Sequence, residues 1–220
     1  MKLTKLQISF IAVMVVLSFA QFFGDIHIAG FPLSGLAVIL GIVFFFADKI
    51  IRKIPTEESG FDIRLIGKDF KTKRILYWII LPVILELISL YAQKTFLPGS
   101  MEHLMQRVEP FLDFSNLPFV AVNLVILALG EEIAWRAFFQ NKLSKVSGAI
   151  PAVLIASVLF ALGHITAGNV WIVTLDIFTV FIHSIIYGIV FNKTKNAWMS
   201  YFSHLIANVA GVAFLIMLTK

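Results

Sequence analysis

The chain of 220 residues contains no cysteine, and only 14% of its residues are charged. The missing cysteine excludes disulfide bonds, a catalytic thiolate and any zinc site built on thiolates. A soluble domain has roughly 45–50% apolar and about 25% charged residues, whereas 59% of this chain is hydrophobic and its mean hydropathy is +0.92. A soluble fold of this size could not hide that excess from water. The composition therefore predicts a membrane protein, with the lipid bilayer as its main partner.

Several protease signatures are missing as well. The sequence has no HExxH, the zinc-binding helix motif of many metallopeptidases. It has no GxSG to supply a serine nucleophile and no GxGD to supply an aspartyl pair. These absences argue against the usual serine, aspartyl and HExxH zinc mechanisms of intramembrane proteolysis.

Seven apolar stretches approach the roughly 20 residues that a helix needs to cross a bilayer. They are 6–23, 33–49, 75–93, 117–140, 148–166, 170–191 and 197–218. The third contains Pro82, which a membrane helix tolerates as a local kink. We therefore predict an all-α fold, a polytopic transmembrane bundle of about seven helices, and a single membrane domain over 1–220.

Lysine and arginine residues are divided unevenly between the two sides that these spans create. Fourteen lie on the side of the N-terminus, many of them in the polar stretch 49–74, and three lie on the other side. Cytoplasmic loops are enriched in these residues, so Lys2 and 49–74 are predicted to be cytoplasmic and Lys220 to be outside. This describes a multi-pass protein of the cell membrane. The stretch 49–74 is also expected to hold a short amphipathic piece on the membrane surface.

The basic character of the chain has the same explanation. The net charge is +5 and the isoelectric point is about 9.5. Loops that face anionic lipid account for such a surplus. No nucleic-acid partner is expected.

Polar residues inside the predicted spans form three short motifs. Ionisable groups are costly within a membrane and are functional candidates for that reason. Residues 131–136 read EExxxR, 160–164 read FxxxH, and 204–208 read HxxxN. Four-residue spacing places both members of each motif on one helical face. Each motif alone is weak, because a Glu–Arg pair can be purely structural and a membrane histidine can simply cap a carbonyl. Three motifs in order, on separate apolar helices, indicate one site.

The spacing gives the two adjacent glutamates different roles. Glu132 and Arg136 are four residues apart and can form an ion pair that lowers the cost of both charges. Glu131 lies about 100° further round the helix and is not neutralised by that pair. Glu131 is therefore the candidate general base. His164 could hydrogen-bond Glu131 or help to hold a water molecule.

His204 and Asn208 offer two side-chain donors on one face of the last predicted helix. Two donors aimed at one point can stabilise the oxyanion that forms when water attacks a peptide carbonyl. A base, a positioned water and an oxyanion site together predict peptide hydrolysis without a serine or cysteine nucleophile. One estimate disagrees: straight helices place His204 only about 10 Å beyond the start of its span, less deep than Glu131.

The three motifs, in this order, resemble those of the CAAX-processing and bacteriocin-processing (CPBP) family of intramembrane endopeptidases, which includes the eukaryotic CAAX prenyl endopeptidases. The resemblance covers about 117–212, the expected catalytic core. It implies a helical membrane fold with a cavity that opens to the cytoplasm. The catalytic residues that it implies are Glu131, His164, His204 and Asn208. It leaves Glu132 and Arg136 in supporting roles.

The resemblance suggests cleavage of a membrane-associated or leader peptide, in pheromone processing or in bacteriocin maturation or immunity. Possible zinc ligands are Glu131, Glu132, His164 and His204. Because HExxH is absent, metal-free glutamate catalysis is preferred, and Zn²⁺ stays open as a cofactor. The first rival is a non-catalytic bacteriocin-immunity or scaffold protein in the membrane. The second is a small ion-coupled transporter that uses the EExxxR cluster as its ion site.

Four other polar residues carry weaker expectations. Glu86 and Asp176 are candidates for facing the same cavity or for capping a neighbouring helix. His183 is expected to be structural. His103 is expected in an external loop without a role.

Overall fold

The computed structural model describes residues 3–23, 26–28, 31–109, 112 and 114–219. Lys2 and Lys220, which enter the predicted orientation, lie outside the described residues. The apolar runs form helices because a bilayer core has no water for unpaired backbone groups. Within the described part, six helices are long and apolar enough to cross a membrane. These are α1 (Lys5–Ala20, extended by a 3₁₀ turn, Gln21–Phe23), α2 (Leu33–Ile51), α4 (Ile75–Phe96), α6 (Leu117–Glu132 and its continuation), α9 (Val170–Thr194) and α10 (Ala197–Thr219).

The fifth predicted span forms a shorter helix, α8 (Ala149–Leu162). Its 14 residues rise about 21 Å, less than the roughly 30 Å of a bilayer core. Six long helices and this short one confirm the predicted all-α bundle of about seven. The prediction placed the end of α8 too late, since the helix stops before His164.

The long helix that contains α6 changes its winding midway. After Glu132 it continues as a π-helical segment, Ile133–Gln140, and then as α7, Asn141–Ser147. π-Helical turns are rare and often occur at functional sites. Every side chain of the π-helical segment is buried.

Short elements connect the spans. Two strands of two residues each, β1 (His27–Ile28) and β2 (Phe31–Pro32), pair antiparallel between α1 and α2. The polar stretch after α2 holds two 3₁₀ turns, Thr56–Glu58 and Ile63–Leu65, and a single helical turn, α3 (Ile66–Asp69). Where a loop was expected, the chain forms the amphipathic helix α5 (Ser100–Val108).

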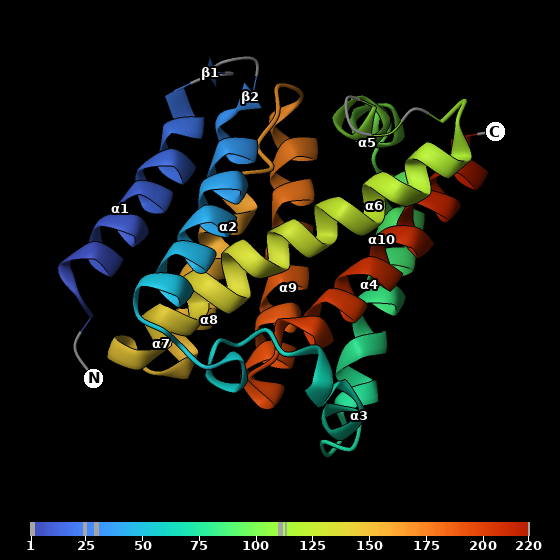
Figure 1. Ribbon diagram of the computed structural model, residues 1–220. Coiled ribbons are helices and arrows are strands. Elements are labelled where there is room, and N and C mark those ends of the chain that lie inside the picture. The colour runs from blue at the N-terminus through green and yellow to red at the C-terminus, as the bar shows by residue number, and fades with distance from the viewer. Residues whose placement is uncertain (1–2, 24–25, 29–30, 110–111, 113, 220) are drawn as a thin grey trace.

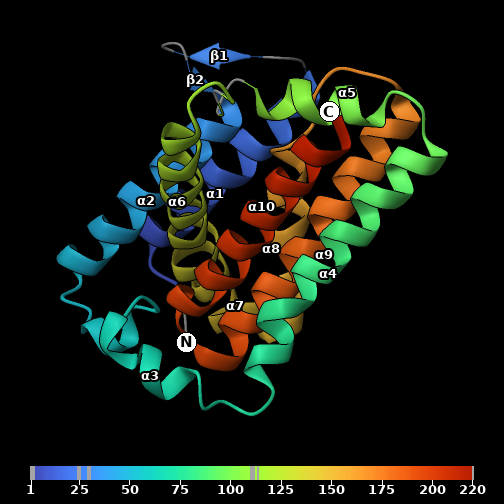
Figure 2. The ribbon, with the colours of Figure 1, turned by 90° about the vertical axis from the view of Figure 1, so that its right-hand side faces the viewer.

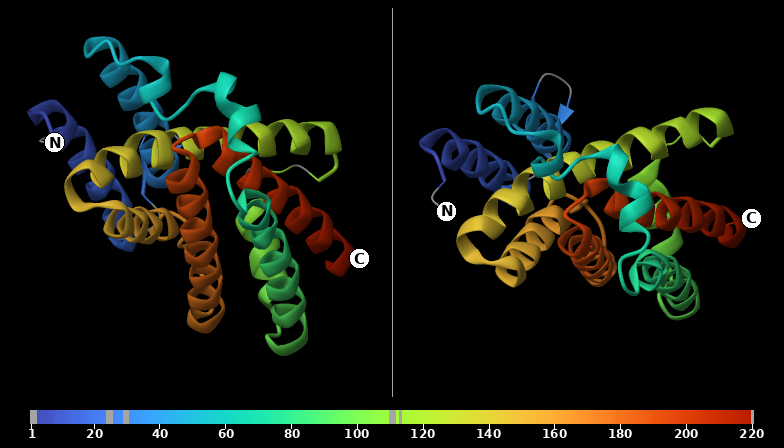
Figure 3. Two further views of the ribbon diagram at one scale, coloured as in Figure 1. Left: turned by 90° about the horizontal axis from the view of Figure 1, so that it is seen from below. Right: turned by 60° about the horizontal axis from the view of Figure 1, so that its bottom comes forward.

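The helices place the polar connections at two opposite ends of the bundle. In Figure 1, α3 and α7 lie at the lower end, near the start of α1, and the β-hairpin and α5 lie at the upper end with the last turns of α10. Figure 1 shows α6 running obliquely across the bundle, and α10 lies beside it in Figures 1 and 2. Helices α4, α9 and α10 pack against one another, as seen from below in Figure 3.

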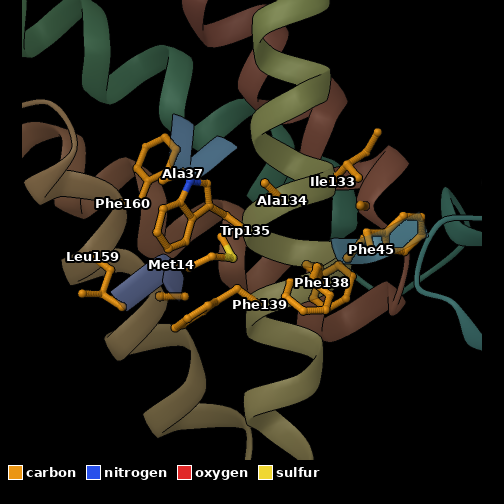
Figure 4. Packing of buried hydrophobic residues seen from close by; sticks show 14 residues of the cluster. Met14, Ala37, Phe45, Ile133, Ala134, Trp135, Phe138, Phe139, Leu159 and Phe160 are labelled. Atoms are coloured by element: carbon orange, nitrogen blue, oxygen red, sulfur yellow. The ribbon is translucent and has the colours of Figure 1, made fainter. Parts of the chain in front are cut away.

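The main core surrounds the π-helical segment. Trp135, Phe138 and Phe139 pack there against α1, α2 and α8 (Figure 4), and all three are at most 3% exposed. Away from this core, large apolar side chains such as Phe23 and Phe96 are 84% and 79% exposed. Exposed apolar surface of that kind is suited to lipid. Packing from several helices thus fixes the residues that follow Glu132.

The polar stretch is fastened to the start of α10 by Asn196. The Asn196 Nδ2 donates to the Asp62 backbone O at 2.9 Å and to Asp69 Oδ2 at 2.7 Å. Phe61 stacks on Trp198 with ring centroids 4.8 Å apart. The Arg64 guanidinium, hydrogen-bonded to the Asp62 carboxylate, holds the pKa of that carboxyl below its usual value. These contacts set where α10 begins.

Candidate active site

Glu132 is the centre of a buried polar cluster. Its side chain is fully buried, and its Oε1 lies 3.2 Å from Arg136 Nη1 and 3.0 Å from His204 Nδ1. The ion pair expected from the four-residue spacing is confirmed. The contact with His204 was not expected, because His204 was predicted to act together with Asn208.

Arg136 ties this cluster to α8 and α9. Its Nη2 donates to the Ser184 hydroxyl at 2.8 Å and to the Ser184 backbone O at 3.2 Å. The guanidinium lies over the Phe160 ring, 4.8 Å from the centroid, and 5.6 Å from the centroid of Tyr187. The carboxylate, the hydroxyl and the two ring faces compensate the buried cation in part, since its Nε has no hydrogen-bond partner among the described residues.

His204 lies between the two adjacent glutamates. Its Nδ1 faces Glu132, and its Nε2 is 3.6 Å from Glu131 Oε2. The ring stacks on Tyr187 with centroids 4.5 Å apart and an interplanar angle of 17°. An ionised carboxylate only accepts hydrogen bonds, so Nδ1 carries a proton. His204 Nε2 therefore accepts when the ring is neutral and donates when the ring is an imidazolium.

The depth estimate that separated His204 from Glu131 is wrong. The estimate assumed that residue number along each helix measures depth in the bilayer. Helix α6 crosses the bundle obliquely (Figure 1), so the two residues meet although they lie at different distances along their helices.

Glu131 differs from its neighbour in exposure. Its side chain is 22% exposed, against 0% for Glu132. Its distance of 3.6 Å to His204 is longer than a hydrogen bond. The expected contrast holds: Glu132 belongs to the ion pair, and Glu131 lies outside it on a more open face.

His164 follows the end of α8 and caps it. Its Nδ1 lies 2.9 Å from the Phe160 backbone O. A carbonyl only accepts, so Nδ1 donates and Nε2 stays available. Among the described residues, no hydrogen bond joins His164 to Glu131, so the carbonyl-capping alternative describes this contact. Whether His164 also holds a water stays a prediction.

Asn208 lies one turn after His204 on α10 and is partly exposed. In the described part of the chain its side chain makes no hydrogen bond to protein. Its two polar atoms are thus free for a ligand. Its role as an oxyanion donor, and the cavity expected around it, stay predictions.

The residues proposed as zinc ligands do not form a metal site in this arrangement. Among the described residues, no three side chains of His, Cys, Asp or Glu are placed to hold one ion. The reason lies in His204, whose two nitrogens face different glutamates. An ion on Nε2 would have Glu131 beside it, while Glu132 Oε1 is directed to the opposite nitrogen and to Arg136.

Several residues of this region were missed from the sequence. Tyr187 and Ser184 on α9 contact His204 and Arg136. Gln140, one turn after Arg136, donates to the Gly188 backbone O at 2.9 Å. A polar residue four positions beyond Arg136 in an apolar span could have drawn attention to Gln140.

A second buried cluster lies under α5. Asp176 is 3% exposed, with Arg107 Nη1 at 3.1 Å and His103 Nε2 at 3.4 Å. The expectation that His103 lies in a loop is wrong, because α5 folds onto the bundle and buries the side chain.

The fold and the cluster around Glu132 define a class of protein. It is a multi-pass helical membrane protein with carboxylate, imidazole and guanidinium groups buried between its spans. Residues 113–210 match the family model described as type II CAAX prenyl endopeptidase Rce1-like. Over this part of the chain, the resemblance to the CAAX protease family that was drawn from the motifs is confirmed. The match to this family model supports the activity of an intramembrane endopeptidase of the CAAX type. No curated protein and no solved structure matches the chain.

Proposed function

We propose that the protein hydrolyses a peptide bond of a membrane-associated or leader peptide, with water activated by Glu131 and His164. The observation that carries the proposal is His204, which lies between a carboxylate locked in an ion pair and a second, more open carboxylate. A purely structural ion pair would need only Glu132 and Arg136. The additional acid and imidazole are costly in a membrane, and function is the reason to keep them.

In the proposed reaction, Glu131 accepts a proton from water while the water oxygen attacks the peptide carbonyl carbon. The carbonyl oxygen becomes an oxyanion that receives hydrogen bonds from His204 Nε2 and the Asn208 amide. The C–N bond then breaks, and the protonated Glu131 delivers its proton to the leaving nitrogen. The immediate products are a carboxylic acid and an amine, and transfer of the acid proton to the amine leaves a carboxylate and an ammonium. No step is routed through a metal ion.

The position of His204 sets a condition on this mechanism. Because Nδ1–H is held by Glu132, Nε2 can donate to an oxyanion only when the ring is an imidazolium. Glu132 Oε1 holds the His204 ring through Nδ1, and Arg136 holds Glu132. Glu132 and Arg136 therefore support catalysis by holding His204 in its orientation.

The test is cleavage of candidate membrane peptides by the purified protein, with products identified by mass spectrometry. We expect defined products from the wild type and a loss of about 10²–10⁴-fold in rate with Glu131→Gln. Reactions on the same substrates with a chelator, and then with zinc added back, test whether cleavage needs a metal ion. If the chelator abolishes cleavage and zinc restores it, the metal-free mechanism is contradicted, while the peptidase activity itself is supported.

The two rival functions correspond to other outcomes of the same work. A bacteriocin-immunity or scaffold protein would keep its cellular function in the Glu131→Gln variant at normal protein levels. An ion-coupled transporter would give ion flux in vesicles and no cleavage. Either result would overturn the proposed hydrolysis.

A further inference from the structure

Two facing helices outside the catalytic cluster carry matching polar stripes. Glu86, Ser89 and Gln93 are spaced three and four positions apart on α4, and Thr179 and His183 are four positions apart on α9. We call the following set the polar seam: Pro82, Glu86, Ser89 and Gln93 on α4, with Thr179 and His183 on α9. Lipid-embedded helices can associate through apolar and small residues alone. Helix packing alone therefore does not explain why polar residues lie along both helices at this contact.

The two stripes touch along the seam. The hydroxyl oxygens of Ser89 and Thr179 are 3.3 Å apart. Further along, Glu86 Oε2 lies 3.5 Å from His183 Nδ1, and His183 Nε2 lies 3.2 Å from the Pro82 backbone O. These three contacts join α4 and α9 along the seam.

One end of the seam reaches the face of α10 that carries the candidate oxyanion residues. A Cβ added at Gly211 would lie 2.7 Å from Glu86 Oε1, so the glutamate touches the α10 backbone there. Gly211 follows His204 and Asn208 by seven and three residues, which places all three on one face. The seam thus leads to the catalytic cluster.

The other end of the seam opens into a groove of about 320 Å³. The groove is lined by Ser89, Ala92, Gln93, Phe96, Leu97 and Leu175. Gln93 is only 3% exposed, and its Nε2 donates to Ser89 Oγ at 3.0 Å. Its Oε1 is buried without a hydrogen-bond partner among the described residues. Turning the amide round would only move the deficit to the nitrogen.

A buried amide atom without a partner needs an explanation, and a ligand that binds there is one such explanation. A peptide whose bond is to be cleaved must leave its helical form, and its freed N–H and C=O groups are then costly in lipid. The seam offers donors and acceptors in a row over about 16 Å from Gln93 to Pro82. That length matches about five residues of extended chain.

We propose that the polar seam binds the extended backbone of the substrate's membrane segment and leads it from the bilayer to Glu131. The proposal rests on the proposed peptidase function. The Gln93 amide binds the first backbone group that leaves the lipid, and the Ser89 and Thr179 hydroxyls exchange their mutual contact for contacts to the peptide. For this exchange, α4 and α9 must part slightly.

The absence of cysteine permits a direct test. In Ser89→Cys/Thr179→Cys, a disulfide or a short thiol cross-linker would fasten α4 to α9 where their hydroxyls now touch. Two substrates with one cleavage sequence are compared, one with a membrane segment and one a short peptide. We expect cross-linking to lower the ratio of long-substrate to short-substrate cleavage rates at least tenfold, and reduction to restore it. The two single-cysteine variants, treated alike, are the controls.

The outcomes separate the two proposals. An unchanged ratio, whether both rates persist or both fall together, would overturn the seam and leave the peptidase intact. Wild-type protein that cleaves neither substrate would instead contradict the proposed function. Gln93→Leu is the second measurement, and we expect it to raise the KM for the long substrate several-fold with kcat preserved. If the groove binds a lipid acyl chain and not the peptide, Gln93→Leu should leave the KM for the long substrate unchanged. That result would also contradict peptide binding by the polar seam.

Discussion

The adjacent glutamates allow a sharp comparison, because Glu131→Gln and Glu132→Gln make the same chemical change one residue apart. Glu132 is fully buried, and its Oε1 serves both Arg136 and His204. Glu131 is 22% exposed and lies 3.6 Å from His204. The same substitution should therefore reduce stability at one position and catalysis at the other.

The magnitudes follow from these contacts. Breaking a buried ion pair by neutralising one partner costs about 3–5 kcal/mol, because the other charge stays buried and uncompensated. For a chain of this size, each kcal/mol lowers Tm by about 2–4 °C, so Glu132→Gln should melt on the order of 10 °C lower. Glu131→Gln breaks no ion pair with Arg136 and should melt close to the wild type. Its cleavage rate should fall by about 10²–10⁴-fold.

Thermal unfolding of the detergent-purified proteins and peptide cleavage, measured on the same preparations, give both quantities. Each variant is the matched control of the other, since size and charge change equally. Equal losses of Tm would refute the assignment of Glu132 to the ion pair. Near wild-type cleavage by Glu131→Gln would refute its role as the base.

Three further predictions test other parts of the structure. Asn208→Ala should fold normally and lose about 10²–10³-fold in cleavage rate, the usual loss for one oxyanion donor; a change below tenfold would contradict that role. Reporter fusions at residue 60 and after the last residue should lie on opposite sides of the membrane, with residue 60 cytoplasmic, and signals from one side would contradict seven crossings. Gly188→Ala should cost about 1–3 kcal/mol in thermal unfolding, because its Cβ would lie 2.9 Å from Gln140 Oε1 and from Val153 Cγ1; Gly67→Ala, with open space around it, is the control.

What could be predicted from the sequence was set by local geometry. Apolar runs of membrane length determined the spans, since a bilayer forces them into helices whatever their neighbours. The four-residue spacing of Glu132 and Arg136 fixed their ion pair, and the rotation of about 100° per residue separated Glu131 from it. The order of the three motifs was enough to indicate the resemblance to the CAAX protease family. The match over residues 113–210 confirms that resemblance.

The tertiary structure decided which helices meet, and at which level. The oblique course of α6 brings Glu131 to His204, which straight helices would have kept apart (Figure 1). The early end of α8 turns His164 into a cap for Phe160, and the folding of α5 onto the bundle buries His103 beside Asp176. Helix tilt, helix ends and interhelical register depend on packing along the whole chain. The dihedral rules that make each helix predictable from its own residues do not fix them.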